Sequence, residues 1–348
     1  MNDCPLIGIH VSKRKYRKRI LKLYGRYHGL NLKLFSFTSS DILWKEQGII
    51  GLHLVGNKCK ESILPFPQAV YNRCYNKRIK KIKRLENIIG WNKCFNVINF
   101  FNKWHVYNLL NQSKLKRHLP DTFIYDEVNV SELLKKYKLV YIKPFYGNKG
   151  KRVYRVELTD NGDIHISSHS TAPRYICRKN EDVQKILRKL LQGKKFIVQK
   201  GIRSRQIDNQ YCDIRVLVQK DILGKWAIST KTIKIAYEHF FNTSIYETIY
   251  EAEKLIPNLI PKNTEKSKIL RSLNKISKNA AKVLDTHMGP LGELSVDFII
   301  DEDGKLWITE INGKPQKSIY KDIKNFKDKQ LIYRRPMEYA YYLSQILI

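Results

Sequence analysis

The sequence predicts an α/β (α+β) protein in which a small N-terminal α/β domain precedes two larger α+β lobes. The first observation is that residues 5–11, 31–38 and 49–55 have the apolar pattern of strands, with an amphipathic helix from Ser12 between the first two. The second is a hairpin pattern in residues 296–312. The size agrees with this, because 348 residues with 43% hydrophobic content can bury several cores.

The predicted elements fall into three regions. Residues 1–100 hold the α/β domain, whose helix has Ser12 as N-cap; from about residue 60 this region is expected to be a basic connector that includes a helix. Residues 101–195 form the first large lobe and residues 196–348 the second. The chain ends in a helix over residues 335–347, whose expected packing face is Met337, Ala340, Tyr341, Ser344 and Leu347.

The hairpin near the C-terminus places three oxygen-bearing side chains close together. Alternating apolar residues flank the turn at 301–303, whose acidic side chains are expected to face solvent. Glu310 and Asn312, two apart on one strand, point the same way, and Asp297 faces them across the pair. Mg²⁺ prefers hard oxygen ligands and usually takes one or two carboxylates while phosphates supply others. These residues therefore predict a magnesium-nucleotide site.

A basic, glycine-containing loop follows the predicted strand at 139–142. That strand ends at Lys143, and the loop contains Gly147, Lys149, Gly150 and Lys151. Glycines let backbone amides approach phosphate oxygens, and lysines neutralise the phosphate charge. The loop lacks the Gly-Lys-Ser/Thr ending and the following helix of a Walker A motif. An ordinary basic turn would explain the loop alone, but together with the downstream carboxylates it indicates a phosphate-binding hairpin.

An arginine lies within another strongly apolar strand, at residues 213–218. A guanidinium in such a place is normally paired, and Asp213, two residues from Arg215 on the same face, is the expected partner. The remaining donors of Arg215 would then be available to a phosphate.

Seven short motifs occur in one order along residues 100–316. They are Lys103-Trp104, Leu119-Pro120-Asp121-Thr122, Lys143-Pro144, Val198-Gln199, Asp213-Ile214-Arg215, Gly292-Glu293-Leu294 and Trp307-Ile308-Thr309-Glu310-Ile311-Asn312. In this order they resemble the ATP-grasp superfamily, and most closely its endospore coat-associated YheC/YheD branch. Each motif is weak by itself, whereas seven in the same order are a specific signal.

The resemblance implies an ATP-grasp fold, in which two α+β lobes sandwich the nucleotide behind a small pre-ATP-grasp domain. It implies an ATP- and Mg²⁺-dependent ligase that activates a carboxylate as an acyl phosphate for attack by an amine or similar nucleophile, with a role in spore coat formation. The residues it implies for ATP are Lys103, Lys143, Gly147, Lys149, Gly150, Lys151, Gln199, Lys200, Ile202 and Asp213; for catalysis, Arg215, Lys234 and Asn242; and for the metal, Asp297, Glu310 and Asn312.

Three positions depart from the family pattern. Asn242 is followed by Thr243 where a glycine-rich stretch is common, Ser295 stands where many amide-forming relatives have an arginine, and Arg152 replaces a frequent glycine. Two alternatives therefore stay open, a nucleotide-binding structural spore-coat protein without turnover and a basic nucleic-acid-binding protein. The carboxylate substrate and the acceptor are not identified.

The net charge of +33 implies an acidic partner. Basic clusters at residues 13–19 and 77–84 suit an anionic polymer, an acidic coat protein or, less favoured, nucleic acid; solvated helix faces in a lysine-rich composition are the alternative. No apolar run has the length of a membrane span, and the N-terminus lacks an export signal. With six scattered cysteines, these features predict a cytoplasmic protein.

Overall fold

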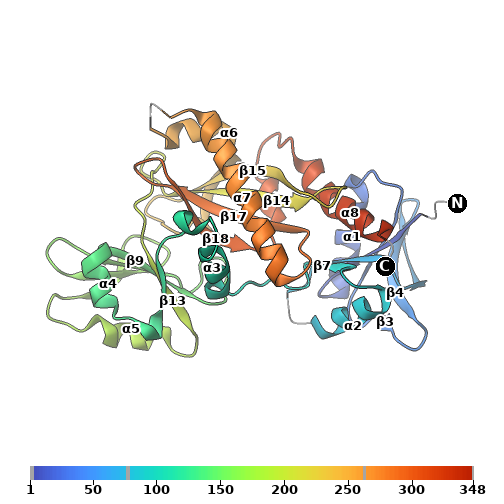
Figure 1. The fold of residues 1–348 in the computed structure, drawn as a ribbon, viewed down its shortest axis with the longest axis horizontal. Helices are drawn as coiled ribbons and strands as arrows, with labels where there is room; N and C mark the ends of the chain where they lie inside the picture. The colour runs from blue at the N-terminus through green and yellow to red at the C-terminus, as the bar shows by residue number, and fades with distance from the viewer. Residues whose placement is uncertain (1–3, 76–78, 262–263, 347–348) are drawn as a thin grey trace.

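The computed structural model describes residues 4–75, 79–261 and 264–346. Three β-sheets follow one another along the chain, each packed against helices, so the predicted α+β class is confirmed (Figure 1).

The N-terminal sheet has a parallel centre and an antiparallel edge. The parallel strands are β2 (Lys33–Phe37), β1 (Leu6–His10), β6 (Ala69–Asn72) and β7 (Cys94–Phe95). The edge consists of β4 (Gly48–Val55), β5 (Lys58–Pro65) and β3 (Ile42–Leu43), and the helices are α1 (Arg17–Tyr27) and α2 (Ile79–Ile89). The expected connector from about residue 60 is therefore part of the domain, because it supplies strands to the sheet as well as α2.

The start of α1 differs from the prediction. A 3₁₀ turn, η1 (Arg14–Tyr16), precedes the helix, and Ser12 does not cap it. Instead Arg14 and Arg17 turn toward the buried Asp41, with nitrogen–oxygen distances of 2.5 Å and 3.4 Å. This long-range contact fixes the beginning of the helix. It buries Arg17 and pairs Arg14, whose side chain stays 54% exposed, within the basic face expected at residues 13–19.

The middle sheet is antiparallel throughout. Its order is β12 (Pro173–Cys177), β11 (Ile164–Ser167), β10 (Tyr154–Leu158), β9 (Leu139–Pro144), β13 (Phe196–Lys200) and β8 (Thr122–Ile124), with η4 (Tyr125–Glu127) after β8. The helices α4 (Val130–Tyr137) and α5 (Val183–Leu191) pack their apolar stripes on it. Because β13 pairs with β9 and β8, the middle sheet extends past residue 195 to Lys200.

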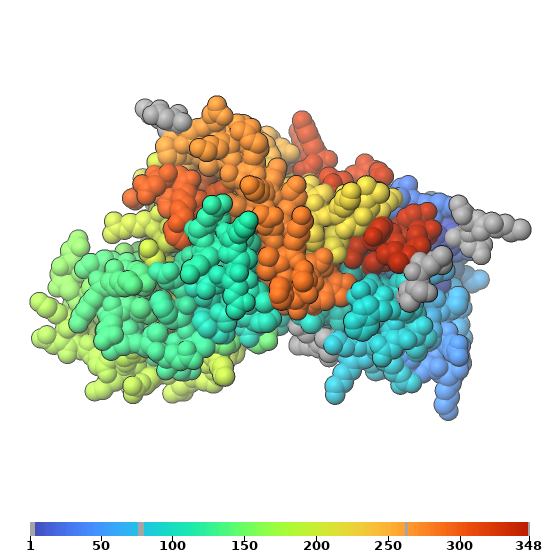
Figure 2. Space-filling view, in the orientation of Figure 1, coloured from blue at the N-terminus to red at the C-terminus, as the bar shows by residue number. Residues whose placement is uncertain are grey.

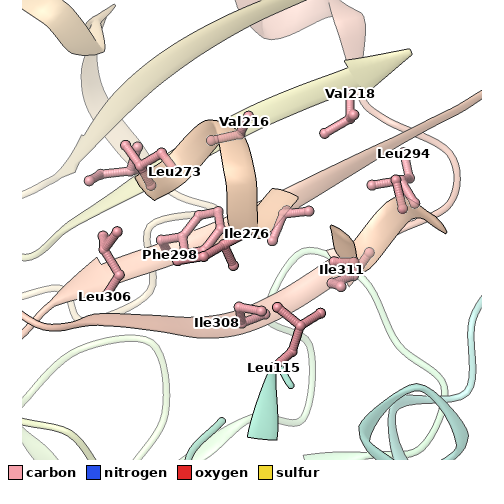
Figure 3. Packing of buried hydrophobic residues seen from close by; sticks show 14 of the residues in the cluster. Leu115, Val216, Val218, Leu273, Ile276, Leu294, Phe298, Leu306, Ile308 and Ile311 are labelled. Atoms are coloured by element: carbon pink, nitrogen blue, oxygen red, sulfur yellow. The ribbon is translucent and has the colours of Figure 1, made fainter. Parts of the chain in front are cut away.

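The C-terminal sheet is also antiparallel. Its order is β16 (Tyr246–Glu251), β15 (Trp226–Ala236), β14 (Cys212–Lys220), β17 (Glu293–Ile300) and β18 (Leu306–Asn312). The long helix α7 (Lys266–Met288) covers one face together with α3 (Lys103–Asn111), and both helices are visible in Figure 2. Figure 3 shows Leu273 and Ile276 of α7 packed on Val216 and Phe298 of the sheet. Short turns complete this part: η3 (Lys116–His118), α6 (Ala252–Leu255), η5 (Ile256–Leu259) and η6 (Lys317–Lys321).

The C-terminal helix joins the first and third sheets. Helix α8 spans Lys329–Gln345, so it begins before the predicted residue 335. Its buried Met337 and Ala340 belong to a core that also contains Ile7 of β1 and Leu217 of β14. Of the expected packing face, Tyr341 is partly buried, and Leu347 lies outside the described residues. The helix lies between the two sheets in Figure 1 and holds the N-terminal domain against the C-terminal one.

Candidate active site

One cavity lies between the middle and C-terminal sheets. Its volume of about 350 Å³ is within the range of small-molecule pockets. Every residue that the sequence analysis proposed for ATP, metal or catalysis lines this cavity. The structure therefore brings together side chains from β9, the β9–β10 loop, β13, β14, β15, β17, β18 and the start of α3.

The oxygen-bearing side chains lie on the β17–β18 ladder. Asp297 is directly opposite Glu310, and Asn312 is opposite Ser295. Asn312 donates a hydrogen bond from Nδ2 to Asp297 Oδ2 over 3.3 Å. The predicted hairpin is present, but Asp301 in its turn is partly buried, because its carboxylate accepts hydrogen bonds from two backbone amides of the turn and from Trp307 Nε1.

Arg215 pairs with a different carboxylate than expected. Its Nε and Nη2 donate to the two oxygens of Asp297 over 2.7 Å and 2.6 Å. Asp213 instead pairs with Lys234 over 2.9 Å. The expected Asp213–Arg215 pair is wrong because directly opposite residues in a ladder are about 5 Å apart, whereas residues two apart on one strand are separated by about 6.6 Å. Arg215 faces Asp297, and Asp213 faces Lys234.

This pairing changes the ionisation of the groups involved. Burial alone lowers the pKa of the Arg215 guanidinium, but the facing Asp297 carboxylate reverses the effect and raises it above its ordinary value. Burial raises the pKa of the Asp213 carboxyl, and the neighbouring Lys234 opposes that rise. Arg215 therefore stays charged at the centre of the cavity.

Two lysines converge on Glu310. Lys103 Nζ lies 2.8 Å from Glu310 Oε1, and Lys143 Nζ donates to Gln199 Oε1 over 2.7 Å and to the Thr309 carbonyl over 3.4 Å. Burial lowers the pKa of Lys143 to about 8, and the charge of Lys103 adds to this while that of Glu310 opposes it. Two cations beside one carboxylate leave an unbalanced positive charge that suits a phosphate group.

The β9–β10 loop closes against the C-terminal lobe. Lys149, Gly150 and Arg152 have left-handed backbone angles, with φ of 54°, 63° and 58°. A Cβ added at Gly150 would lie 2.0 Å from Asn242 Nδ2, so only glycine permits this approach. Asn242 is itself within 2.6 Å of His169 Nδ1. The loop lysines are thereby placed at the mouth of the cavity.

The end of β13 forms the opposite wall. Gln199 Nε2 donates a hydrogen bond to Thr122 Oγ1 over 3.0 Å, and Gln199 Oε1 accepts a hydrogen bond from Lys143 Nζ. Lys200 lies 5.4 Å from the centre of the Tyr137 ring. Ile202 follows and contributes an apolar surface near Ile299 of β17. A flat aromatic base would fit against such apolar groups beside exposed backbone.

Sequence reasoning missed several cavity residues. Lys314 lies two residues beyond Asn312, in the bend after β18, where the alternation of the strand no longer applies. Burial lowers its pKa to about 8, and the charge of Arg73 adds to this. Tyr75 comes from the N-terminal domain, and no local pattern in the sequence indicates that it reaches the cavity.

The donor set suits a magnesium ion that shares its ligands with phosphates. No group of three or more His, Cys, Asp and Glu side chains arranged for a metal occurs in the described part of the chain. Asp297, Glu310 and Asn312 supply two carboxylates and an amide, and Arg215 and Lys103 already balance the carboxylate charges. Three side-chain ligands are too few to surround a magnesium ion with protein alone. They suit a cation whose other ligands are phosphate oxygens and water.

Among the described residues, no helix is both long enough and apolar enough to cross a membrane.

Two α+β lobes that close a basic loop over a carboxylate hairpin define the ATP-grasp class of fold. The chain belongs to the YheC/D-like ATP-grasp family, whose family model matches residues 91–343. It is 30% identical to the endospore coat-associated protein YheD of Bacillus subtilis (strain 168), over 98% of this chain and 79% of that protein. It is 24% identical to YheC of the same organism, over 84% of this chain and 82% of YheC.

Solved structures agree on the fold. The ATP-grasp ligase PsnB, determined with a minimal precursor, Mg and ADP, aligns with a TM-score of 0.55 at 14% identity, covering 96% of this chain and 98% of PsnB. This likeness confirms the predicted ATP-grasp fold.

Proposed function

We propose that this protein is an ATP- and Mg²⁺-dependent ligase that activates a carboxylate as an acyl phosphate and transfers the acyl group to an amine or similar nucleophile. The observation that carries the proposal is one cavity in which lysines suited to phosphate lie close to the carboxylates of β17–β18. Lys103 pairs with Glu310 there, and Lys143 and Asp297 line the same cavity. Phosphoryl transfer depends mostly on such positioning and electrostatics.

Each group has a role that its position supports. Lys143, Lys103 and the loop residues 147–151 bind phosphate oxygens, and the end of β13 holds the base. Asp297, Glu310 and Asn312 would hold Mg²⁺, and the ion would supply positive charge to offset the charge that develops during phosphoryl transfer. Arg215 and Lys234 orient the transferred phosphoryl group from the floor of the cavity, and Asn242 fixes the loop above it.

The chemistry needs no protein nucleophile. A carboxylate oxygen of the substrate attacks the γ-phosphorus of ATP, the bond to the β-phosphate oxygen breaks, and ADP leaves. The acceptor nitrogen then attacks the acyl carbon, inorganic phosphate leaves, and the nitrogen loses a proton. Closing the loop over the cavity excludes water, which would otherwise hydrolyse the acyl phosphate.

The segment that departs from the family pattern still belongs to the site. Thr243 donates a hydrogen bond to Asp213, and Thr243, Ser244 and Tyr246 line the cavity. This observation favours turnover over a purely structural protein. From the names of the relatives we further propose that the protein acts in spore coat formation. We also propose that it acts in the cytoplasm and that its partner is an acidic polymer or coat protein, which the net charge of +33 supports.

The direct test is incubation with ATP, Mg²⁺ and pooled amino acids and peptides, with ADP release and the mass of products as readouts. Formation of ADP with a product whose mass equals that of two reactants minus water supports the ligase. ATP binding without ADP release in any pool would favour the structural alternative. Lys143→Met is the control, because it removes a phosphate contact and should abolish ADP release.

A further inference from the structure

Lys314 is a cation of the cavity that has no carboxylate partner among the residues that the structure describes. It follows β18, and its Nζ lies 3.9 Å from the centre of the Tyr75 ring. Lys103, Arg215 and Lys234, which line the same cavity, each form an ion pair. No carboxylate in the parts of the chain that the structure describes forms an ion pair with Lys314.

The one carboxylate whose charge acts on Lys314 among the described residues, that of Glu293, is already neutralised. Glu293 is buried and forms an ion pair with Lys317, whose Nζ lies 2.7 Å from Glu293 Oε2. Arg73 Nη1 lies 3.9 Å from Glu293 Oε1. Gln219 Nε2 donates to the same carboxylate over 2.8 Å. Because two cations share Glu293, it has no unmatched negative charge for Lys314. A partly buried ammonium in this position is stabilised by an anion that the protein itself does not provide.

The charge of the whole cavity supports the same conclusion. Eight basic residues and three acidic residues line it. The basic residues are Lys103, Lys143, Lys149, Lys151, Lys200, Arg215, Lys234 and Lys314, and the acidic residues are Asp213, Asp297 and Glu310. Metal ions bound to ATP neutralise most of the phosphate charge. A positive excess therefore remains for a second, non-nucleotide anion.

Lys314 lines the same cavity as the proposed metal ligands. It is two residues past Asn312, in the bend that follows β18. The ring of Tyr75, from the N-terminal domain, contacts the ammonium group of Lys314. Tyr75, Phe100 and Tyr146 form a row of aromatic rings with centroid separations of 5.3 Å and 5.5 Å. A group bound by Lys314 would therefore share the cavity with the carboxylate that is activated at the metal.

We propose that Lys314 binds a second carboxylate of the substrate, so that the substrate of this ligase is a dicarboxylate or an acidic peptide and not a monocarboxylic acid. The inference rests on the proposed function, because the first carboxylate is the one converted to the acyl phosphate. Lys314 is then a residue that determines specificity, and it leaves nucleotide binding unaffected.

The test uses melting temperatures of the full chain saturated with ADP and Mg²⁺. The probes are the dicarboxylates from malonate to adipate, L-glutamate and a glutamyl-glutamate dipeptide, compared with acetate and butyrate at equal ionic strength. We expect at least one dianionic probe to raise the melting temperature at a concentration about tenfold or more below that of any monocarboxylate. Lys314→Met should abolish this preference and leave the shift caused by ADP and Mg²⁺ unchanged.

Lys225→Met is the matched control, because Lys225 is an exposed lysine outside the cavity and its loss should preserve the preference. Equal responses to mono- and dicarboxylates, or a preference that survives Lys314→Met, would overturn the inference. Failure of the proposed function looks different, since ADP and Mg²⁺ alone would then leave the melting temperature unchanged.

Discussion

Arg215 on β14 and Asp297 on β17 face each other across the ladder and form a two-point ion pair, with nitrogen–oxygen distances of 2.7 Å and 2.6 Å. The side chains are only 12% and 5% exposed. The pair therefore holds a proposed metal ligand in a fixed orientation before any nucleotide binds.

Removal of the arginine should be costly for stability. Arg215→Met leaves Asp297 buried without its main partner, and we expect a loss of about 3–5 kcal/mol in the free energy of unfolding, measured with urea. Saturating ATP and Mg²⁺ should recover part of this loss, because the metal replaces the missing cation. Arg178→Met is the control, since Arg178 is 69% exposed and pairs at the surface with Asp163. A loss no larger than that of the control would show that the pair is unimportant for stability.

The metal assignment predicts a separation between stability and activity at Glu310. Glu310→Gln keeps the shape of the side chain and removes one negative charge. ADP release should be abolished and the Mg²⁺ concentration needed for the ATP-induced stabilisation should rise, while the unfolding free energy without ligand changes by about 1 kcal/mol or less. Retained ADP release together with a collapse of stability would instead identify Glu310 as a structural partner of Lys103.

The close approach of the loop to Asn242 makes Gly150 sensitive to substitution. Gly150→Ala adds a Cβ that would lie 2.0 Å from Asn242 Nδ2, so the loop must move and ATP should bind more weakly. Gly193→Ala is the control for backbone strain alone. Gly193 also has a positive φ, of 76°, but an added Cβ there would have no neighbour within 4 Å. Titration calorimetry with ATP and Mg²⁺ compares the two variants. Equal affinity in both would contradict a role for the loop in closing the cavity.

The buried Lys143 predicts opposite pH effects on the free and the nucleotide-bound protein. Its folded pKa is about 8 against an ordinary value of 10.5. Between these values the unfolded chain holds the proton and the folded protein has released it, so the stability of the free protein should gain from this group as pH rises. Phosphates favour the charged lysine, so the stabilisation by ATP should shrink above pH 8. Melting temperatures of wild type and Lys143→Met from pH 7 to 10 check this, and equal slopes would refute it.

Local patterns predicted the parts of the fold that depend on neighbours in the sequence. The alternation around residues 296–312 predicted that Asp297 faces Glu310 across the hairpin, and the two are paired, although a β-bulge between Asp297 and Phe298 shifts the register to reach this pairing. The start of α1 was missed because the distant Asp41 attracts Arg14 and Arg17 and overrides Ser12 as a cap. Pairings between strands, such as Arg215 with Asp297, depend on sheet order, which a single sequence does not state.

The same limit explains the site residues that were missed. Tyr75 reaches the cavity from the N-terminal domain, and the packing of α8 between two sheets holds that domain in place. Neither relationship has a short-range signal, since both depend on contacts between residues far apart in the chain. Lys314 follows the end of β18, and nothing in the local sequence distinguishes it from the other basic residues, 65 in all.

The central claim, that the cavity binds ATP through a shared metal, is tested most directly by the melting temperature of the wild-type protein with ATP and Mg²⁺ together and separately. A ligand that binds only the folded state stabilises it by about 2.7 kcal/mol at one hundred times its dissociation constant. We predict an increase that grows with ATP concentration and is larger with Mg²⁺ than without it. A folded protein whose melting temperature does not move at millimolar ATP and Mg²⁺ would contradict the account.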